Sequence, residues 1–179
     1  NARRHELLRT QPNRGHELVT ALEKDFDVTV VTQNVDNLHE RAGSTHVIHL
    51  HGELMKATSS LCPNDPNCIV TLPDDHLDIR MGDKAADGSQ LRPFIVWFGE
   101  SVPMIEPAIH EVAQADILVV IGTSLNVYPA AGLLNYTSDH CRIYLIDPKT
   151  VAYNPQLGIR HIMKGASEGM AELTDILLQ

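Results

Sequence analysis

Short apolar runs alternate with helical patterns along the chain. The runs predicted as buried strands occupy residues 28–31, 47–50, 94–98, 117–121 and 143–146. Apolar residues at helical spacing occupy 15–24, about 106–115 and the stretch from about 167, and shorter helices are predicted after 37 and near 130. Strands that alternate with helices predict an α/β fold with a doubly wound parallel sheet.

Residues 57–90 have a different character. Turn-forming residues are scattered there among Asp, Asn and Ser, namely Pro63, Pro66, Pro73, Gly82 and Gly88. Such a stretch is typical of an inserted lobe or long loop outside the main core. We therefore divide the chain into a main domain, 1–56 with 91–179, and a small lobe, 57–90.

The charge balance narrows the classes of function. The chain has 179 residues, of which 43% are hydrophobic, and its net charge is −9, from 14 Lys and Arg against 23 Asp and Glu. This charge disfavours binding to nucleic acid or anionic lipid. No stretch has the roughly 20 apolar residues that span a bilayer, and the first residues contain no signal-peptide core. Three cysteines are an odd, sparse set for a secreted disulfide scaffold. We expect a cytoplasmic protein that binds neither nucleic acid nor membranes, in an oligomeric state that the sequence leaves open.

Polar or small residues follow each predicted strand. In an open parallel sheet the carboxyl ends of the strands meet at one edge, and ligands bind there. We therefore expect these residues to line one crevice. In chain order they are Gln33, Asn34 and Asp36, then His51 and Gly52, then Phe98, Gly99 and Glu100, then Gly122, Thr123 and Ser124, and finally Asp147.

Most of these candidates have a structural alternative. The turn at 122–124 suits phosphate, because glycine admits close approach of backbone N–H groups, but such turns are also common for geometry alone. Asp147 either hydrogen-bonds a ribose or forms a turn before Pro148. Asn34 and Asp36 either face a polar ligand or cap the following helix.

The histidines around residue 50 also allow several interpretations. Strand parity places His49 and His51 on one face and His46 on the other. The pair could ligate a metal, one histidine could be a general base, or both could be structural. Gly52 favours catalysis at His51, because a missing side chain leaves room for a substrate.

Four segments in order resemble the sirtuin family of NAD-dependent protein lysine deacylases, in particular its bacterial branch. They are TQNVDNLH at 32–39, HLHGEL at 49–54, LRP at 91–93 with VWFGE at 96–100, and IGTSLNVYPAAG at 121–132. The resemblance implies a Rossmann-like parallel sheet with a small inserted lobe, and a cleft in which NAD and an acyl-lysine peptide meet.

The resemblance assigns roles to individual residues. His51 matches the catalytic base. The positions that match the family's contacts to NAD, together with Asp147 as the ribose candidate, are Gln33, Asn34, Asp36, Gly122, Thr123, Ser124 and Asp147. Val96, Phe98 and Gly99, with Val127 in the segment 126–128, match two strands between which the substrate peptide adds as a third.

The reaction that this implies consumes NAD. A base at His51 deprotonates a ribose hydroxyl, and the products are nicotinamide, acyl-ADP-ribose and free lysine. The alternatives are a mono-ADP-ribosyltransferase, a catalytically silent module that binds NAD or ADP-ribose, and a metal hydrolase that uses His49 and His51.

Three departures from the family pattern give further expectations. The family's N-terminal Gly-rich segment has no counterpart, so we expect the natural polypeptide to be longer. The family usually holds a structural zinc with two Cys-x-x-Cys pairs, but the corresponding positions here hold Ser59, Cys62, Lys84 and Asp87. Cys62 and Cys68 lack chelating spacing, so we expect that zinc has been lost and that packing and local hydrogen bonds hold the lobe.

The third departure concerns the acyl group. Arg3 stands where the branch that removes succinyl and malonyl groups carries an arginine, whose guanidinium could hold an acyl carboxylate through two hydrogen bonds. The alternative is a solvated helix arginine, because the tyrosine that accompanies it in that branch would lie before Asn1.

Overall fold

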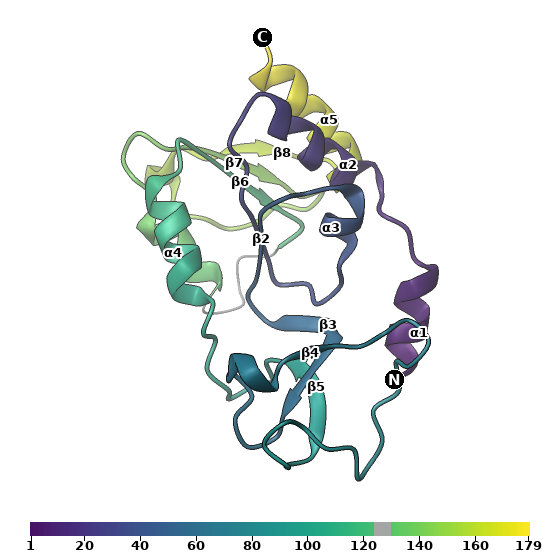
Figure 1. Cartoon of the computed structure of the whole chain (residues 1–179). Coiled ribbons are helices and arrows are strands. Elements are labelled where there is room, and N and C mark those ends of the chain that lie inside the picture. The colour runs from purple at the N-terminus through teal and green to yellow at the C-terminus, as the bar shows by residue number, and fades with distance from the viewer. Residues whose placement is uncertain (124–129) are drawn as a thin grey trace. The chain divides into compact units, whose positions relative to one another are not determined.

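The computed structural model describes residues 1–123 and 130–179 (Figure 1). Contacts divide the chain into two compact units, and each is described by itself. Unit 1 consists of Asn1–Gln11, Thr32–Leu38 and His49–Pro103, and unit 2 of Pro12–Val31, His39–Ile48 and Met104–Gln179.

Unit 2 contains a parallel sheet. Its strands are β6 (Ile117–Ile121), β7 (Arg142–Ile146) and β8 (Arg160–Ile162), in the order β6-β7-β8. The register places Ile121 opposite Ile146, so β6 and β7 end together at the carboxyl edge. The parallel strands predicted at 117–121 and 143–146 are thereby confirmed, and β8 is an addition.

The helices of unit 2 follow the apolar periodicity. The predicted helices are confirmed as α2 (Arg14–Ala21) with the 3₁₀ helix η1 (Leu22–Lys24), α4 (Ile105–Gln114) and α5 (Ala166–Leu177). Asn13 caps α2 by accepting a hydrogen bond from the N–H of His16. The helix predicted near 130 is the 3₁₀ helix η3 (Ala130–Tyr136), and a 3₁₀ turn η4 (Pro155–Leu157) precedes β8.

An apolar core joins the sheet to the helices of unit 2. Figure 1 shows α2 and α5 side by side. Gly169 lets α5 approach β7, because a Cβ at this position would lie 2.3 Å from Cγ2 of Ile146. The buried residues of this core are Leu18, Leu22, Tyr144, Ile146, Ile162, Met170 and Leu173.

Unit 1 contains an antiparallel sheet instead. The strands are β3 (Gly52–Ser59), β4 (Val70–Thr71) and β5 (Leu91–Ile95), in the order β4-β3-β5. The helix α1 (Ala2–Arg9) and the 3₁₀ turn η2 (Pro66–Cys68) belong to the same unit. Ala57, Leu72 and Leu77 form a small core of their own.

One prediction about this region is wrong. The run at 94–98 is not a parallel strand: β5 ends at Ile95 and is antiparallel to β3. The stretch 57–90 has a small core of its own, in which Leu72 and Leu77 are buried. All of 57–90 lies inside unit 1, together with residues on both sides of it, and the domain boundaries drawn from the sequence stay a prediction.

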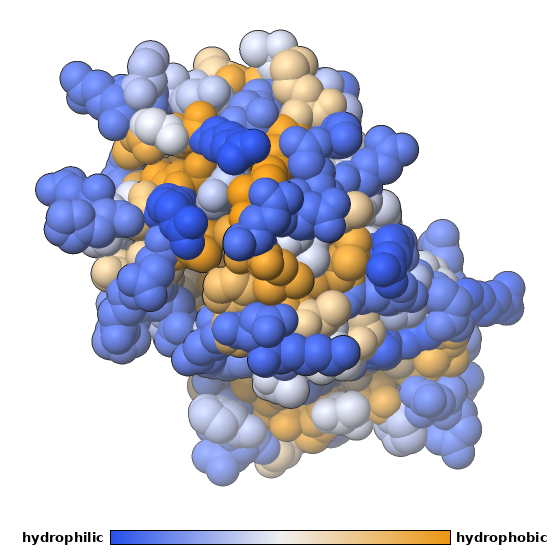
Figure 2. Space-filling model, turned by 90° about the horizontal axis from the view of Figure 1, so that it is seen from above, coloured by the Kyte–Doolittle hydropathy of each residue, from blue (hydrophilic) through white to orange (hydrophobic). Residues whose placement is uncertain are grey.

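The strands β1 (Val30–Thr32) and β2 (Val47–His49) pair with each other, and the short helix α3 (Leu38–Ala42) lies between them in the chain. None of the described helices has the length and apolarity needed to cross a bilayer. On the face drawn in Figure 2, apolar surface shows between hydrophilic side chains.

Candidate active site

His51 lies in the turn between β2 and β3. Its ring is half-buried, and Nδ1 lies 3.2 Å from the carbonyl oxygen of Gln33 in the loop that follows β1. Because a carbonyl only accepts hydrogen bonds, this contact requires the proton on Nδ1. In the neutral ring the lone pair is then on Nε2, which can accept a proton.

His49 contacts the same loop in the same way. Its Nδ1 lies 3.3 Å from the carbonyl oxygen of Asn34, and the side chain is only 8% exposed. The two histidines therefore meet the carbonyls of two consecutive residues. His49 is the more buried of the two and His51 the more accessible.

Gly52 has a backbone reason to be glycine. Its φ is +80°, and a Cβ there would lie 2.1 Å from the carbonyl oxygen of Phe94. The two segments are also joined by a hydrogen bond, because the N–H of Val96 donates to the carbonyl of His51 at 2.9 Å. The prediction that Gly52 leaves room for a substrate is wrong, because that space is occupied by β5.

The loop after β1 is fixed by local hydrogen bonds. Asp36 accepts from the N–H of Leu38 at 3.0 Å, which forms an Asx turn directly before α3. The Asn34 side chain is exposed, and the N–H of Leu54 donates to the carbonyl of Val35 between them at 2.7 Å. This last bond ties the loop to β3.

Arg4 is a buried residue that the sequence reasoning missed. It is 1% exposed, and its Nε donates to the carbonyl of Leu54 at 2.7 Å while Nη1 donates to Oδ1 of Asn1 at 3.0 Å. Burial lowers the pKa of Arg4, and the nearby Asp78 carboxylate opposes that shift. The neighbouring Arg3, which the resemblance singled out, is exposed. The available signal was the helical spacing of Arg4 with the buried Leu7.

The segment after β5 forms a tight turn. The N–H of Glu100 donates to the carbonyl of Trp97 at 3.0 Å, and Gly99 has a φ of +90°. Phe98 at the corner is fully exposed, and Trp97 is 55% exposed. Val96, Phe98 and Gly99, the residues predicted to meet a peptide, are therefore contiguous with β5 and reach the surface.

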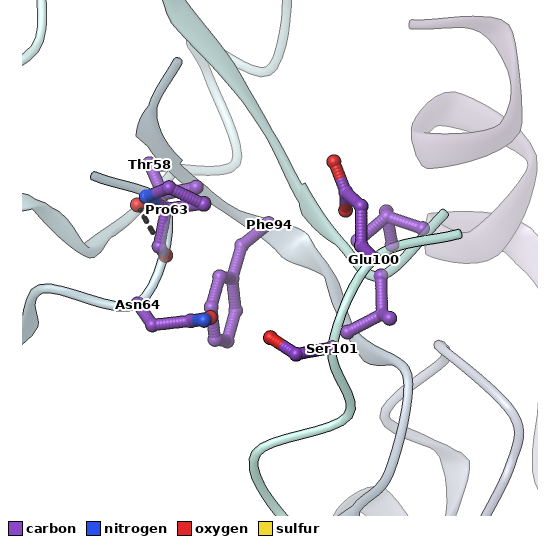
Figure 3. A pocket seen from close by; sticks show the side chains of 8 residues that line it. Thr58, Pro63, Asn64, Phe94, Glu100 and Ser101 are labelled. Carbon is purple, nitrogen blue, oxygen red and sulfur yellow. Dashed lines mark hydrogen bonds between the residues drawn. The ribbon is translucent and has the colours of Figure 1, made fainter. Parts of the chain in front are cut away.

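A small open cavity of about 230 Å³ lies beside this segment (Figure 3). Figure 3 shows Pro63 and Asn64 on one side of it, Glu100 and Ser101 on the other, and the ring of Phe94 between them. The cavity therefore opens next to Val96.

In unit 2, the candidate residues lie at the carboxyl edge of the parallel sheet. Gly122 has a φ of +62°, and its N–H donates to the carbonyl of Ile146 at 3.1 Å. This brings Gly122 and Thr123 beside Asp147. Asp147 accepts from the N–H of Lys149 at 2.8 Å, as expected of a turn former. Ser124 and Val127, with the rest of 126–128, lie outside the described residues.

Hydrogen bonds join three of the four residues at the expected zinc positions, Ser59, Cys62 and Asp87. Ser59 is fully buried, and its hydroxyl donates to the carboxylate of Asp87 and contacts the hydroxyl of Ser89. The same oxygen accepts the N–H groups of Leu61 and Cys62, at 3.0 and 2.8 Å. Ser59 thus organises the turn with a hydroxyl.

These residues do not fit a tetrahedral zinc site. Burial raises the pKa of the Cys68 thiol, and the nearby carboxylate of Asp87 raises it further, although zinc needs a thiolate. Lys84 brings a positive charge. Within residues 1–123 and 130–179, no group of three close His, Cys, Asp or Glu side chains includes Cys62, Cys68 or Asp87. The loss of zinc stays a prediction.

Comparison with known families shows which family the chain belongs to. Residues 1–129, most of the chain, match the model of the Sir2 family. The chain belongs to the Sir2 family. The resemblance found in the four sequence segments is confirmed, and so is the Rossmann-like fold class, because solved Sir2 homologues share the fold.

Relatives of this Sir2-family chain cover nearly all of it. The NAD-dependent protein deacylase of Bacteroides thetaiotaomicron is 60% identical over 178 residues, which are 99% of this chain and 76% of that relative. A crystal structure of a Sir2 homolog–NAD complex has a TM-score of 0.81 and 34% identity, over 96% of this chain and 67% of that one. The Sir2–p53 peptide–NAD⁺ structure has a TM-score of 0.74 and 28% identity, over 96% and 72%.

Proposed function

We propose that this protein is an NAD-dependent deacylase that removes acyl groups from the lysine side chains of proteins. Its products are nicotinamide, acyl-ADP-ribose and free lysine. The observation that carries the proposal is the orientation of His51, whose bond to the Gln33 carbonyl leaves Nε2 as a base. The 60% identity to a bacterial NAD-dependent protein deacylase supports NAD as co-substrate and deacylation as the reaction.

The family resemblance assigns several of the described residues to contacts with NAD. In unit 2 the left-handed turn at Gly122, followed by Thr123, stands at the carboxyl edge of the sheet with Asp147 on the neighbouring strand. In unit 1 the loop with Gln33, Asn34 and Asp36 presents amide and carboxylate groups, and Ser124 is assigned to the same role from the sequence. NAD supplies a ribose carbon that becomes electrophilic as nicotinamide leaves.

His51 acts as the general base of the reaction. Its Nε2 takes a proton from a hydroxyl, so the ring becomes a cation. The Nδ1–H group donates to the Gln33 carbonyl, so the loop after β1 orients the ring.

The acyl-lysine peptide binds along the segment that follows β5. The proposal follows the family resemblance, in which the peptide adds as a strand beside this segment and pairs through main-chain hydrogen bonds. Val96, Phe98 and Gly99 contact the peptide on this side, and Val127 is the counterpart assigned from the sequence. The Sir2–p53 peptide–NAD⁺ relative supports a peptide of this kind as substrate.

Arg3 gives the enzyme a preference for acyl groups that carry a carboxylate. It is exposed on the first turn of α1, where its guanidinium can form two hydrogen bonds to a succinyl or malonyl group.

A cytoplasmic location is supported by the free thiols of Cys62, Cys68 and Cys141 in the described residues.

Product analysis tests this function. The protein is incubated with NAD and matched acetyl-lysine and succinyl-lysine peptides, and the products are identified by mass spectrometry. We expect free lysine peptide and acyl-ADP-ribose in equal amounts, with faster turnover of the succinyl peptide. Arg3→Met is expected to slow the succinyl reaction alone. ADP-ribosylated protein without acyl-ADP-ribose would overturn the proposal in favour of mono-ADP-ribosyl transfer.

A further inference from the structure

An ion pair spans the segment that follows β5. Nη1 and Nη2 of Arg92 donate to Oε1 and Oε2 of Glu100 at 2.7 and 3.0 Å, which is the paired arrangement of a guanidinium on a carboxylate. Arg92 lies within β5, opposite Thr58 of β3, and Glu100 closes the turn. The pair therefore connects the strand β5 to the far end of the surface segment.

Both partners also hold backbone groups of the segment. Nη2 of Arg92 donates to the carbonyl of Ile95 at 2.7 Å, and the N–H of Trp97 donates to Oε2 of Glu100 at 3.0 Å. The hydrogen bonds from Arg92, followed by that from Trp97, lower the pKa of Glu100 to about 2, so the carboxylate stays charged at neutral pH. The pair thus fixes the backbone on both sides of Val96.

Packing contributes little to the same segment. Phe98 is fully exposed and Trp97 is 55% exposed, so neither aromatic ring anchors the turn in a core. Arg92 is better shielded, with 19% of its side chain exposed against 37% for Glu100. An ion pair with two hydrogen bonds and partial shielding holds its geometry better than an ordinary surface pair.

The segment is also joined to the candidate catalytic turn. The N–H of Val96 donates to the carbonyl of His51 at 2.9 Å, directly before the residues that the ion pair holds. A shift of Val96 would therefore move the peptide segment away from the histidine that serves the same substrate.

We propose that Arg92 and Glu100 are positioning residues for the substrate peptide. They hold the backbone of Val96–Gly99 in the turn beside which the peptide binds, and they contact neither NAD nor the reacting atoms. The proposal rests on the proposed function, since it assumes that the acyl-lysine peptide binds at this segment.

Trp97 allows a test that does not depend on turnover, because it is the only tryptophan in the sequence and lies in the segment itself. An acetyl-lysine peptide without aromatic residues is titrated into the protein in the absence of NAD, and Trp97 emission reports its Kd. The same peptide is then used in steady-state kinetics. Glu100→Gln removes the charge, Arg92→Lys keeps the charge without the paired hydrogen bonds, and Glu172→Gln removes the Lys164–Glu172 pair in unit 2 as the control.

Glu100→Gln is expected to raise the peptide Kd and the peptide KM about tenfold, and Arg92→Lys about threefold. The kcat and the KM for NAD should stay within about twofold, and Glu172→Gln should change nothing. An unchanged peptide Kd and KM in Glu100→Gln, with normal turnover, would overturn the positioning role and leave the proposed function intact. If Glu100→Gln weakened peptide binding but the wild-type protein showed no deacylation, the proposed function would be overturned and the positioning role would stand.

Discussion

Different kinds of interaction stabilise unit 2 and unit 1 internally. In unit 2 a continuous apolar core joins a parallel sheet to α2 and α5, and Leu173 and Leu145 are completely buried in the unit. In unit 1 the apolar core is small, and buried or shielded polar groups join its parts: Arg4 to Leu54, and Ser59 to Asp87. The same unit contains His51 and the Arg92–Glu100 pair.

This difference shows where positional accuracy is needed. Apolar burial stabilises a fold in proportion to area and without direction, whereas a hydrogen bond fixes the distance and angle between two named atoms. A general base and a peptide-binding edge need fixed positions. Unit 1 therefore relies on directional hydrogen bonds, whereas unit 2 relies on buried apolar area.

The largest expected effect concerns the apolar core of unit 2. Leu173→Ala leaves a cavity in the core of unit 2 and should lower the free energy of unfolding by about 3 kcal/mol. Leu178→Ala is the control, because Leu178 is 53% exposed in the same region of the chain, and should cost less than about 0.5 kcal/mol. Denaturant unfolding measures both. Equal losses would show that α5 does not depend on this core.

The next effect tests the polar side. Arg4→Met keeps the apolar bulk but leaves the Leu54 carbonyl without its donor, and should lower the free energy of unfolding by about 2 kcal/mol. Arg3→Met, one residue earlier and exposed, should change it by less than about 0.5 kcal/mol. If Arg4→Met were as stable as Arg3→Met in denaturant unfolding, the buried arginine would not tie α1 to β3.

Ser59→Ala should have a smaller effect that depends on pH. Hydrogen bonds from Ser59 and then Ser89 lower the pKa of Asp87 below its ordinary value of 3.8. A lowered pKa means that the folded protein favours the charged carboxylate, so this stabilisation is present above pH 3.8 and is lost as the pH falls through the lowered value.

The variant should therefore melt about 3 °C below the wild type at neutral pH, and the gap should narrow in acid, where only the loss of the bonds from the N–H groups of Leu61 and Cys62 remains. Thermal unfolding at a series of pH values measures it. A difference in melting temperature that does not change with pH would show that Ser59 does not act through the ionisation of Asp87.

The smallest expected effect is none at all. If hydroxyl and carboxylate groups have replaced zinc around Ser59, a chelator should leave the melting temperature unchanged, and elemental analysis should find no stoichiometric zinc. One zinc per chain, or a lower melting temperature after chelation, would break the contrast, because a metal would then hold unit 1.

Periodicity could predict most of the elements of unit 2, β8 excepted, but not the antiparallel strands of unit 1. The strands β6 and β7 are covered by apolar contacts and read as unbroken apolar runs, so 117–121 and 143–146 were found. The strand β3 reads GELMKATS, with no alternation, and its register with β5 shifts between Gly52 and Ala57. An irregular strand with polar contacts leaves no simple pattern.

The same contrast holds for the candidate site. His51 and the loop with Gln33 could be identified, because strand ends and the family segments mark them. The contact of Arg4 could not, since its partner Leu54 is 50 residues away in the chain, and only the helical spacing of Arg4 with Leu7 hinted at burial. Arg92 and Glu100 carried opposite charges at the two ends of one family segment, but only the folded turn brings the two groups together.

The central claim is that His51 is the base of an NAD-dependent deacylation. Its most direct test is the turnover of an acetylated peptide with NAD by His51→Ala, beside His76→Ala as the control, which removes an exposed histidine of the same unit. The account predicts that His51→Ala still folds and still binds the peptide, as reported by Trp97 emission, while acyl-ADP-ribose formation falls at least about 100-fold and His76→Ala stays normal. Deacylation by His51→Ala at the wild-type rate would contradict it.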